Sequence, residues 1–227
     1  MPNPLPRDLP PETCARLQVS YARPQTSLAM TEALVALAVS RGLAGVGVFP
    51  VFAAAAARAA AGKVSVVASV GGLGLAKPTI KAIEATSAIK DGASEVQIAP
   101  LRAPLLAGDG EAARHELLEV VRACRATGRD VLIHALIHSA ELMRHAGEGA
   151  VESACRAVRQ GACDGLIDAG DDASHAVVRT HATGLLLRRR VMCPIGAADT
   201  LTGALRPGVD RVDLVVDAAG LESTADA

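Results

Sequence analysis

The chain contains almost no aromatic residues. Its 227 residues include two phenylalanines, one tyrosine and no tryptophan, and the formal net charge is −1. Proteins that bind single-stranded nucleic acid stack bases on aromatic rings, and a basic surface attracts the phosphate backbone. Because the chain has little of either, we expect no nucleic-acid partner.

Three further features are missing: paired cysteines, an apolar leader and a long apolar run. The five cysteines show no C-x-x-C spacing, and their odd number argues for a reducing compartment rather than a disulfide framework. The first residues, MPNPLPR, lack the apolar core of a signal peptide. No stretch of about 20 apolar residues is free of charge or glycine, so we expect a cytoplasmic protein without a membrane span.

Half of the residues are apolar, which suits one domain with a large core. Short β-branched runs alternate with longer runs at helical spacing, a pattern typical of repeated βα units around a parallel sheet. The predicted strands are 17–22, 45–49, 64–70, 95–99, 130–136, 164–168, 191–194 and 211–216. Eight such strands predict an α/β fold of the (β/α)8 TIM-barrel type. We expect one domain over residues 1–227, with 1–16 as an N-terminal extension and 218–227 as a short tail that leaves the C-terminal end shortened.

Three segments carry a family resemblance. They are residues 161–171 (GACDGLIDAGD), 193–200 (CPIGAADT) and 93–108 (ASEVQIAPLRAPLLAG). In that order they resemble the active-site segments GADFIKTSTGK, KPAGGVRT and ADEVDVVFPYRALMAG of the deoxyribose-phosphate aldolase family. Residues 45–50 (GVGVFP) resemble the second strand of that family, so the resemblance extends over most of the chain.

The resemblance implies that the family chemistry has been removed. The family forms a Schiff base on a lysine, supported by a second lysine and an aspartate, and the aligned residues here are Leu166, Cys193 and Gln97. None of these side chains can form an iminium ion or shuttle protons as the family residues do. Of the four lysines in the chain, Lys77 alone is expected in a loop at the C-terminal face of the barrel.

The phosphate-binding positions of the family also differ here. The aligned residues are Asp171, Asp199 and Asp213, which would repel a phosphate at short range by about 4 kcal/mol per contact. The resemblance therefore implies a neutral or cationic small-molecule substrate rather than a sugar phosphate. The alternative is that Asp171 and Asp199 simply cap helices that follow strands.

Polar residues near the predicted strand ends form the candidate site. For catalysis we propose Asp168, expected to project into the barrel mouth on the same strand face as Leu166, together with His134 and Cys193. Each has a structural alternative: a histidine at a strand end is as often structural, and Cys193 suits a small buried position. The candidates for substrate binding are Ser20, Gln97, Asp171, Asp199, Asp213 and Arg102, of which Arg102 also suits a structural role.

We expect no cofactor and no metal site. His134 and His138 are four residues apart, which on a strand separates them by roughly 13 Å, too far to share an ion. The run from Arg188 to Arg190 is the densest basic segment, and we interpret it as solvated rather than as a phosphate site.

Two functions stay open at this point. The first is an enzyme that runs acid–base chemistry without a Schiff base, such as a cyclisation, isomerisation, dehydration or C–C bond change. The second is a catalytically inactive pseudoenzyme, either a ligand-binding module or a partner subunit of an active aldolase. The oligomeric state is open as well, with a homodimer as one candidate assembly.

Overall fold

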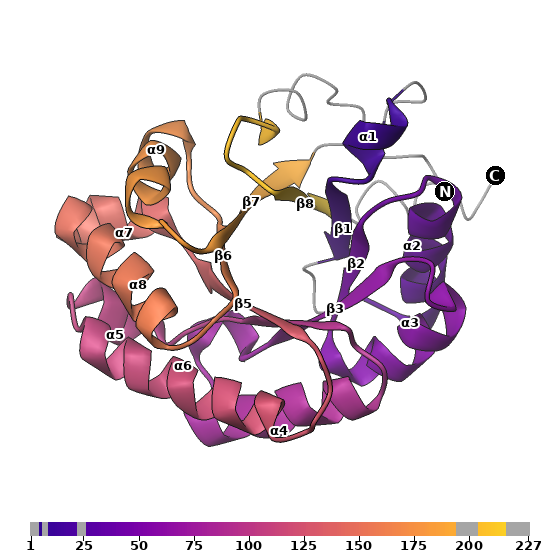
Figure 1. Ribbon diagram of the computed structural model, residues 1–227, viewed down its shortest axis with the longest axis horizontal. Helices are drawn as coiled ribbons and strands as arrows, with labels where there is room; N and C mark the ends of the chain where they lie inside the picture. The colour runs from indigo at the N-terminus through magenta and orange to yellow at the C-terminus, as the bar shows by residue number, and fades with distance from the viewer. Residues whose placement is uncertain (1–4, 6–8, 22–25, 194–203, 217–227) are drawn as a thin grey trace.

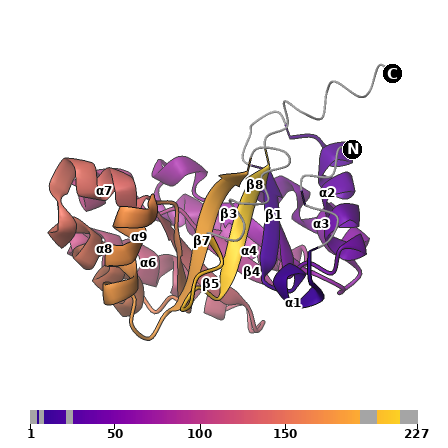
Figure 2. The same ribbon diagram turned by 90° about the horizontal axis from the view of Figure 1, so that it is seen from above.

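The computed structural model of the chain describes residues 5, 9–21, 26–193 and 204–216. Eight parallel strands form a closed barrel in the order of the sequence, and helices surround it (Figure 1). Seen from above, α7, α8 and α9 lie on one side of the strands and α1, α2 and α3 on the other (Figure 2). The predicted TIM barrel is therefore confirmed.

Every predicted strand is present, with most bounds shifted by one or two residues. The strands are β1 (Leu17–Tyr21), β2 (Gly45–Val48), β3 (Ser65–Val70), β4 (Glu95–Ile98), β5 (Leu132–Ile137), β6 (Gly165–Asp168), β7 (Leu186–Cys193) and β8 (Arg211–Val216). The bounds of β8 match the prediction. Strand β7 differs most, because it begins at Leu186 rather than at 191 and includes the whole arginine run.

The helices between the strands follow ordinary start signals. They are α1 (Pro11–Cys14), α2 (Leu28–Ser40), α3 (Ala53–Ala60), α4 (Pro78–Lys90), α5 (Arg102–Leu106), α6 (Gly110–Arg125), α7 (Ser139–Ala146), α8 (Glu148–Gln160) and α9 (Asp172–His181), with 3-10 turns η1 (Pro50–Phe52) and η2 (Gly72–Gly74). Ser27 caps α2 by accepting a hydrogen bond from the Met30 amide, and Pro78 occupies the first turn of α4. No helix within the described segments is both long and apolar enough to cross a membrane.

Apolar side chains fill the layer between the strands and the helices. Val96, Ile133 and Leu166 belong to this outer core and are fully buried. Because side chains alternate along a strand, their neighbours Glu95, Gln97 and others point into the barrel. The inward face of the strands is therefore more polar than their outward face, which packs against the helices.

The lower layer of the barrel interior is an ion cluster. Glu95 accepts hydrogen bonds from Arg188 at 2.5 Å and from Arg211 at 2.9 Å. Burial alone would raise the pKa of Glu95, but the two arginines outweigh it and the pKa is lowered. The carboxylate is thus held in its charged form between two cations, each arriving from a different strand.

The arginine run is paired rather than solvated, which corrects the sequence interpretation. Arg188 and Arg189 are 2% and 6% exposed, and each side chain forms an ion pair. Arg188 and Arg190 point inward to Glu95 and Asp213, whereas Arg189 points outward to Asp172 of α9. A run of three arginines can form a buried strand because each cation meets a carboxylate from elsewhere in the chain.

A second buried ion pair lies behind the strand-to-helix loops. Lys81 of α4 is fully buried, pairs with Glu116 of α6, and donates a hydrogen bond to the Ala99 carbonyl at 2.6 Å. The other oxygen of Glu116 accepts from the Leu101 amide at 2.8 Å. The pair therefore connects two helices to the loop that follows β4.

We predict that Lys81→Met destabilises the fold by about 3–5 kcal/mol, because it leaves the Glu116 carboxylate buried without a cation. Denaturant unfolding measures this loss. The double variant Lys81→Met with Glu116→Leu removes both charges and should recover a large part of it. A single variant as stable as the parent, or a double variant as unstable as the single, would contradict the assignment.

Candidate active site

A cavity of about 630 Å³ opens at the carboxyl ends of the strands. Barrel enzymes build their active sites at this end. The walls are mostly apolar, and the polar lining residues are Ser20, Tyr21, Ser69, Glu84, Gln97, His138 and Arg190. Its size and its few convergent polar groups are typical of a small-molecule site.

Arg190 of β7 forms the centre of the cavity floor. Its Nε donates to Asp213 Oδ2 at 2.7 Å, and one Nη donates to Gln97 Oε1 at 2.8 Å. Gln97 Nε2 in turn donates to Ser69 Oγ at 3.1 Å. This floor network extends from β8 through β7 and β4 to β3 and holds the guanidinium in one orientation.

Asp213 completes the floor from below. It is fully buried, and its Oδ1 accepts from Ser20 Oγ at 2.5 Å while Oδ2 faces Arg190. The close approach of Ser20 depends on Gly47 of β2, where a Cβ would lie 2.0 Å from Ser20 Oγ. Asp213 is therefore a neutralised part of the floor and does not itself line the cavity.

Glu84 of α4 supplies the carboxylate of the cavity wall. Its Oε2 accepts a hydrogen bond from the Gly71 amide at 2.9 Å, just beyond the end of β3. Gly71 has a φ of 93°, a left-handed conformation that favours glycine. A Cβ at Gly71 would also approach Lys81 Cε within 2.8 Å. The turn after β3 thus fixes the Glu84 carboxylate at the cavity.

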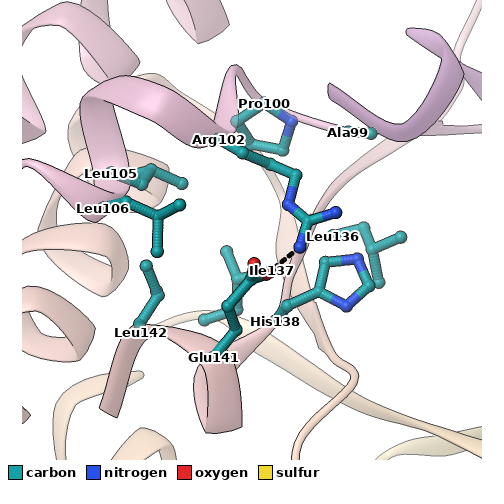
Figure 3. Close-up of a pocket in the computed structure, with 10 residues that line it drawn as sticks. All are labelled: Ala99, Pro100, Arg102, Leu105, Leu106, Leu136, Ile137, His138, Glu141 and Leu142. Carbon is teal, nitrogen blue, oxygen red and sulfur yellow. Dashed lines mark hydrogen bonds and ion pairs between the residues drawn. The ribbon is translucent and has the colours of Figure 1, made fainter. Parts of the chain in front are cut away.

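His138, which follows β5, lies between the main cavity and a smaller pocket. Figure 3 shows its ring near Arg102, whose guanidinium points toward Glu141 of α7 and pairs with it. Burial, and then the positive charge of Arg102, lower the pKa of His138. The imidazole is therefore neutral near pH 7 and able to accept a proton.

His134 lies inside the barrel beneath the floor network rather than in the cavity wall. It is fully buried, and neither ring nitrogen has a partner among the described residues. Burial, and then Arg188, lower the pKa of His134 to about 3. The ring stays neutral at physiological pH and makes no contact with the cavity.

Asp168 points away from the mouth, contrary to the expected orientation. It is fully buried and meets Nδ1 of His175 of α9 at 2.7 Å. Leu166 lies on the same outer face, in the core beneath the helices, so Ile167 is the inward residue. The prediction assumed that Leu166 points into the barrel, and because alternate residues share a strand face, the outward direction of Leu166 turns Asp168 outward as well.

The remaining predicted site residues separate into three groups. Ser20 and Gln97 line the cavity, as expected for substrate-binding residues. Asp171 is exposed and caps α9, accepting from the Ser174 amide at 2.8 Å, which is the structural alternative considered for it. Asp199 lies outside the described residues, and Cys193 ends β7 with a side chain that is also outside them.

Five polar lining residues were not among the predicted site residues: Arg190, Glu84, His138, Ser69 and Tyr21. Arg190 was missed because the run from Arg188 to Arg190 was interpreted as solvated. The signal that could have identified it is alternation, because Arg188 and Arg190 share one strand face, as Glu95 and Gln97 do on β4. Within the described segments, no group of three or more histidine, cysteine, aspartate or glutamate side chains could hold a metal ion.

Comparison with known proteins shows similarity of fold. No family model matches the chain, and no curated protein sequence matches it. The tetrameric deoxyribose phosphate aldolase from Aeropyrum pernix superimposes with a TM-score of 0.74 at 17% identity, covering 89% of this chain and 86% of that one. The aldolase QR15 gives 0.76 at 18% identity, covering 95% and 98%. A more distant neighbour, 2,3-dimethylmalate lyase, gives 0.62 at 14% identity, covering 95% and 80%. The fold is thus that of the TIM-barrel aldolases.

We predict that stability falls as the pH is lowered from 6.5, because unfolding releases His134 to an ordinary pKa near 6.5 from a folded value of about 3. Below pH 6.5 the unfolded chain binds the extra proton, so a fully developed slope is about 1.4 kcal/mol per pH unit for this group. Denaturant unfolding at pH 7, 6 and 5 should show a smaller slope in His134→Gln. His138, retained in both proteins, contributes equally to each. Equal slopes would show that His134 is not buried neutral.

Proposed function

We propose that the chain is a deoxyribose-phosphate-aldolase-like barrel that works without a Schiff base. The main support for this proposal is the position of the four lysines, all of which lie in described segments. Lys63 and Lys90 are exposed at the other end of the barrel, next to β3 and at the end of α4. Lys77 is also exposed and occupies the N-cap position of α4, where its side chain makes no capping hydrogen bond. Lys81 is buried and forms an ion pair with Glu116. None lines the cavity, and an imine requires an amine within reach of the substrate carbonyl.

The inward residues of the cavity floor support the same proposal. Gln97 of β4 and Arg190 of β7 line the cavity, and Ile167 is the inward residue of β6. An amide and an aliphatic side chain have no nucleophile, and arginine does not lose its proton in proteins. The floor offers hydrogen-bond donors and a fixed positive charge in place of a reactive amine.

These groups suit proton-transfer chemistry on a small carbonyl compound. The neutral imidazole of His138 would take a proton from a carbon next to the carbonyl. Arg190, oriented by Asp213 and Gln97, would stabilise the negative charge that develops on oxygen. The reaction class is an isomerisation, cyclisation, dehydration or C–C bond change, with His138 in the role first assigned to His134 and Asp168.

We propose a non-phosphorylated substrate, with a basis that differs from the sequence argument. Asp171 caps a helix and Asp213 is neutralised by Arg190, so an acidic mouth is not what disfavours phosphate. Instead, the cation of the floor already serves two protein acceptors, and Glu84 adds a negative charge to the wall. A dianionic phosphate would have to compete with the Asp213 carboxylate for a single guanidinium, and it would also meet the negative charge of Glu84.

The ordered floor network also favours the second candidate, a ligand-binding module without catalysis. Buried polar groups that hold one another in place give a rigid pocket whether or not a reaction follows. The two candidates differ in what His138 does, since a binding module needs no base.

Imine formation is tested with acetaldehyde and borohydride. We expect no reduced adduct at any cavity residue by intact mass and peptide mapping, while an active deoxyribose-phosphate aldolase treated in parallel is labelled. The urea-unfolded chain serves as the control for nonspecific alkylation of exposed lysines. An adduct formed by the native chain but not by the unfolded one, or cleavage of deoxyribose 5-phosphate above a heat-killed control, would refute the proposal.

The base assignment predicts that His138→Gln lowers kcat by about 100-fold or more on the substrate found by screening non-phosphorylated carbonyl metabolites. Substrate Kd should change little, because the variant keeps the shape and polarity of the wall. Stopped-flow turnover and calorimetric binding provide the two values. Unchanged kcat would reject His138 as the base, and binding without turnover in the parent chain would favour the binding module.

A further inference from the structure

Among the described residues, two charged side chains line the cavity, one on its floor and one on its wall. Arg190 belongs to β7, whereas Glu84 is fixed to the turn that follows β3. The Arg190 side chain extends from β7 to the centre of the floor, where it contacts Gln97 of β4, whereas the Glu84 carboxylate is held at the wall by the Gly71 amide. The cavity is therefore bipolar, with a cation on its floor and an anion on its wall.

Each of these groups retains unused bonding capacity. Arg190 uses Nε and one Nη in the floor network, and its other Nη has no partner among the described residues. Glu84 uses Oε2 for the Gly71 amide, and its Oε1 likewise has no partner in the described part of the chain. Both groups are fixed by one set of bonds and present their remaining atoms for a ligand.

The rest of the cavity lining is mostly apolar. Phe49, Val70, Ala99, Leu136 and Val215 line the cavity together with the charged groups. Such side chains offer no hydrogen bonds but favour contact with methylene groups. The lining thus combines two charged groups with an aliphatic surface.

We propose that the cavity binds a small molecule with an ammonium group at one end and a carboxylate or carbonyl oxygen at the other. The ammonium contacts Glu84, the oxygen contacts Arg190, and an aliphatic chain spans the apolar wall. This assignment names a substrate class for the proposed function. It rests on that function, because it takes the same cavity to be the active site. A ligand with one charge leaves the opposite group unpaired in a partly desolvated site, which weakens binding.

A series of linear probes of matched length tests the proposal. The probes are 4-aminobutanoate, 5-aminopentanoate and 6-aminohexanoate, compared with pentylamine, pentanoate and glutarate at fixed ionic strength. Thermal shift identifies binders, and calorimetry gives Kd. We expect at least one amino acid of the series to bind ten or more times more tightly than each probe that lacks either the ammonium or the carboxylate.

Variants assign the two ends. Glu84→Gln keeps the acceptor for the Gly71 amide and should weaken the amino-acid probe at least tenfold while leaving pentanoate unchanged. The double variant Arg190→Gln with Asp213→Asn avoids an unpaired buried charge and should weaken the amino-acid probe similarly while sparing pentylamine. Glu119→Gln, the same change on the exposed face of α6, is the matched control and should have no effect.

Several outcomes would overturn the inference. They are equal binding of one-ended and two-ended probes, no effect of Glu84→Gln on the amino-acid probe, and no binding by any member of the series. The proposed function fails separately, through a cavity imine trapped by borohydride. If an imine were trapped while the selectivity among the probes stayed as expected, the proposed function would be rejected. The bipolar assignment of the cavity would then still hold.

Discussion

The ion pair between Arg190 and Asp213 is the interaction on which the rest of the site depends. Asp213 is fully buried, and a carboxylate without a partner in that position would cost several kcal/mol. Arg190 meets that requirement at 2.7 Å and is thereby drawn into the barrel. Once the guanidinium is held there, it orients Gln97, and Gln97 orients Ser69.

The barrel interior therefore consists of two charged layers rather than stacked aliphatic side chains. The lower layer pairs Glu95 with Arg188 and Arg211, and the upper layer forms the cavity floor. The two carboxylates and the three cations come from β4, β7 and β8, so closing the barrel is what brings Glu95 of β4 to the arginines of β7 and β8. The cavity lies above the upper layer, with Arg190 and Gln97 in its lining.

The fold could be predicted from the sequence because its signals are local. Alternating β-branched and helical runs gave eight strands, and the bounds of β8 needed no correction. Strand β7 was truncated because Arg188 and Arg189 were interpreted as solvated. Arg188 pairs with the carboxylate of Glu95, which is 93 residues away in the chain, and no local sequence pattern predicts such a partner.

The candidate site was harder to predict, for reasons of side-chain direction. Asp168 was expected at the mouth because Leu166 was assumed to point inward, whereas both side chains point outward and Asp168 meets His175. Ser20 and Gln97 were identified because each is a polar residue near the end of a predicted strand and does line the cavity. Glu84 and His138 come from a helix and from the residue after a strand, where alternation no longer predicts direction.

A double-mutant cycle on Arg190 and Asp213 tests the dependence of the site on this pair most directly. The measurement is the free energy of unfolding of Arg190→Met, Asp213→Asn and the combined variant. We expect the combined variant to be more stable than the sum of the single losses by about 1–3 kcal/mol, because each single change strands a buried polar partner. Additive losses, within about 0.5 kcal/mol, would show that the two side chains do not depend on each other.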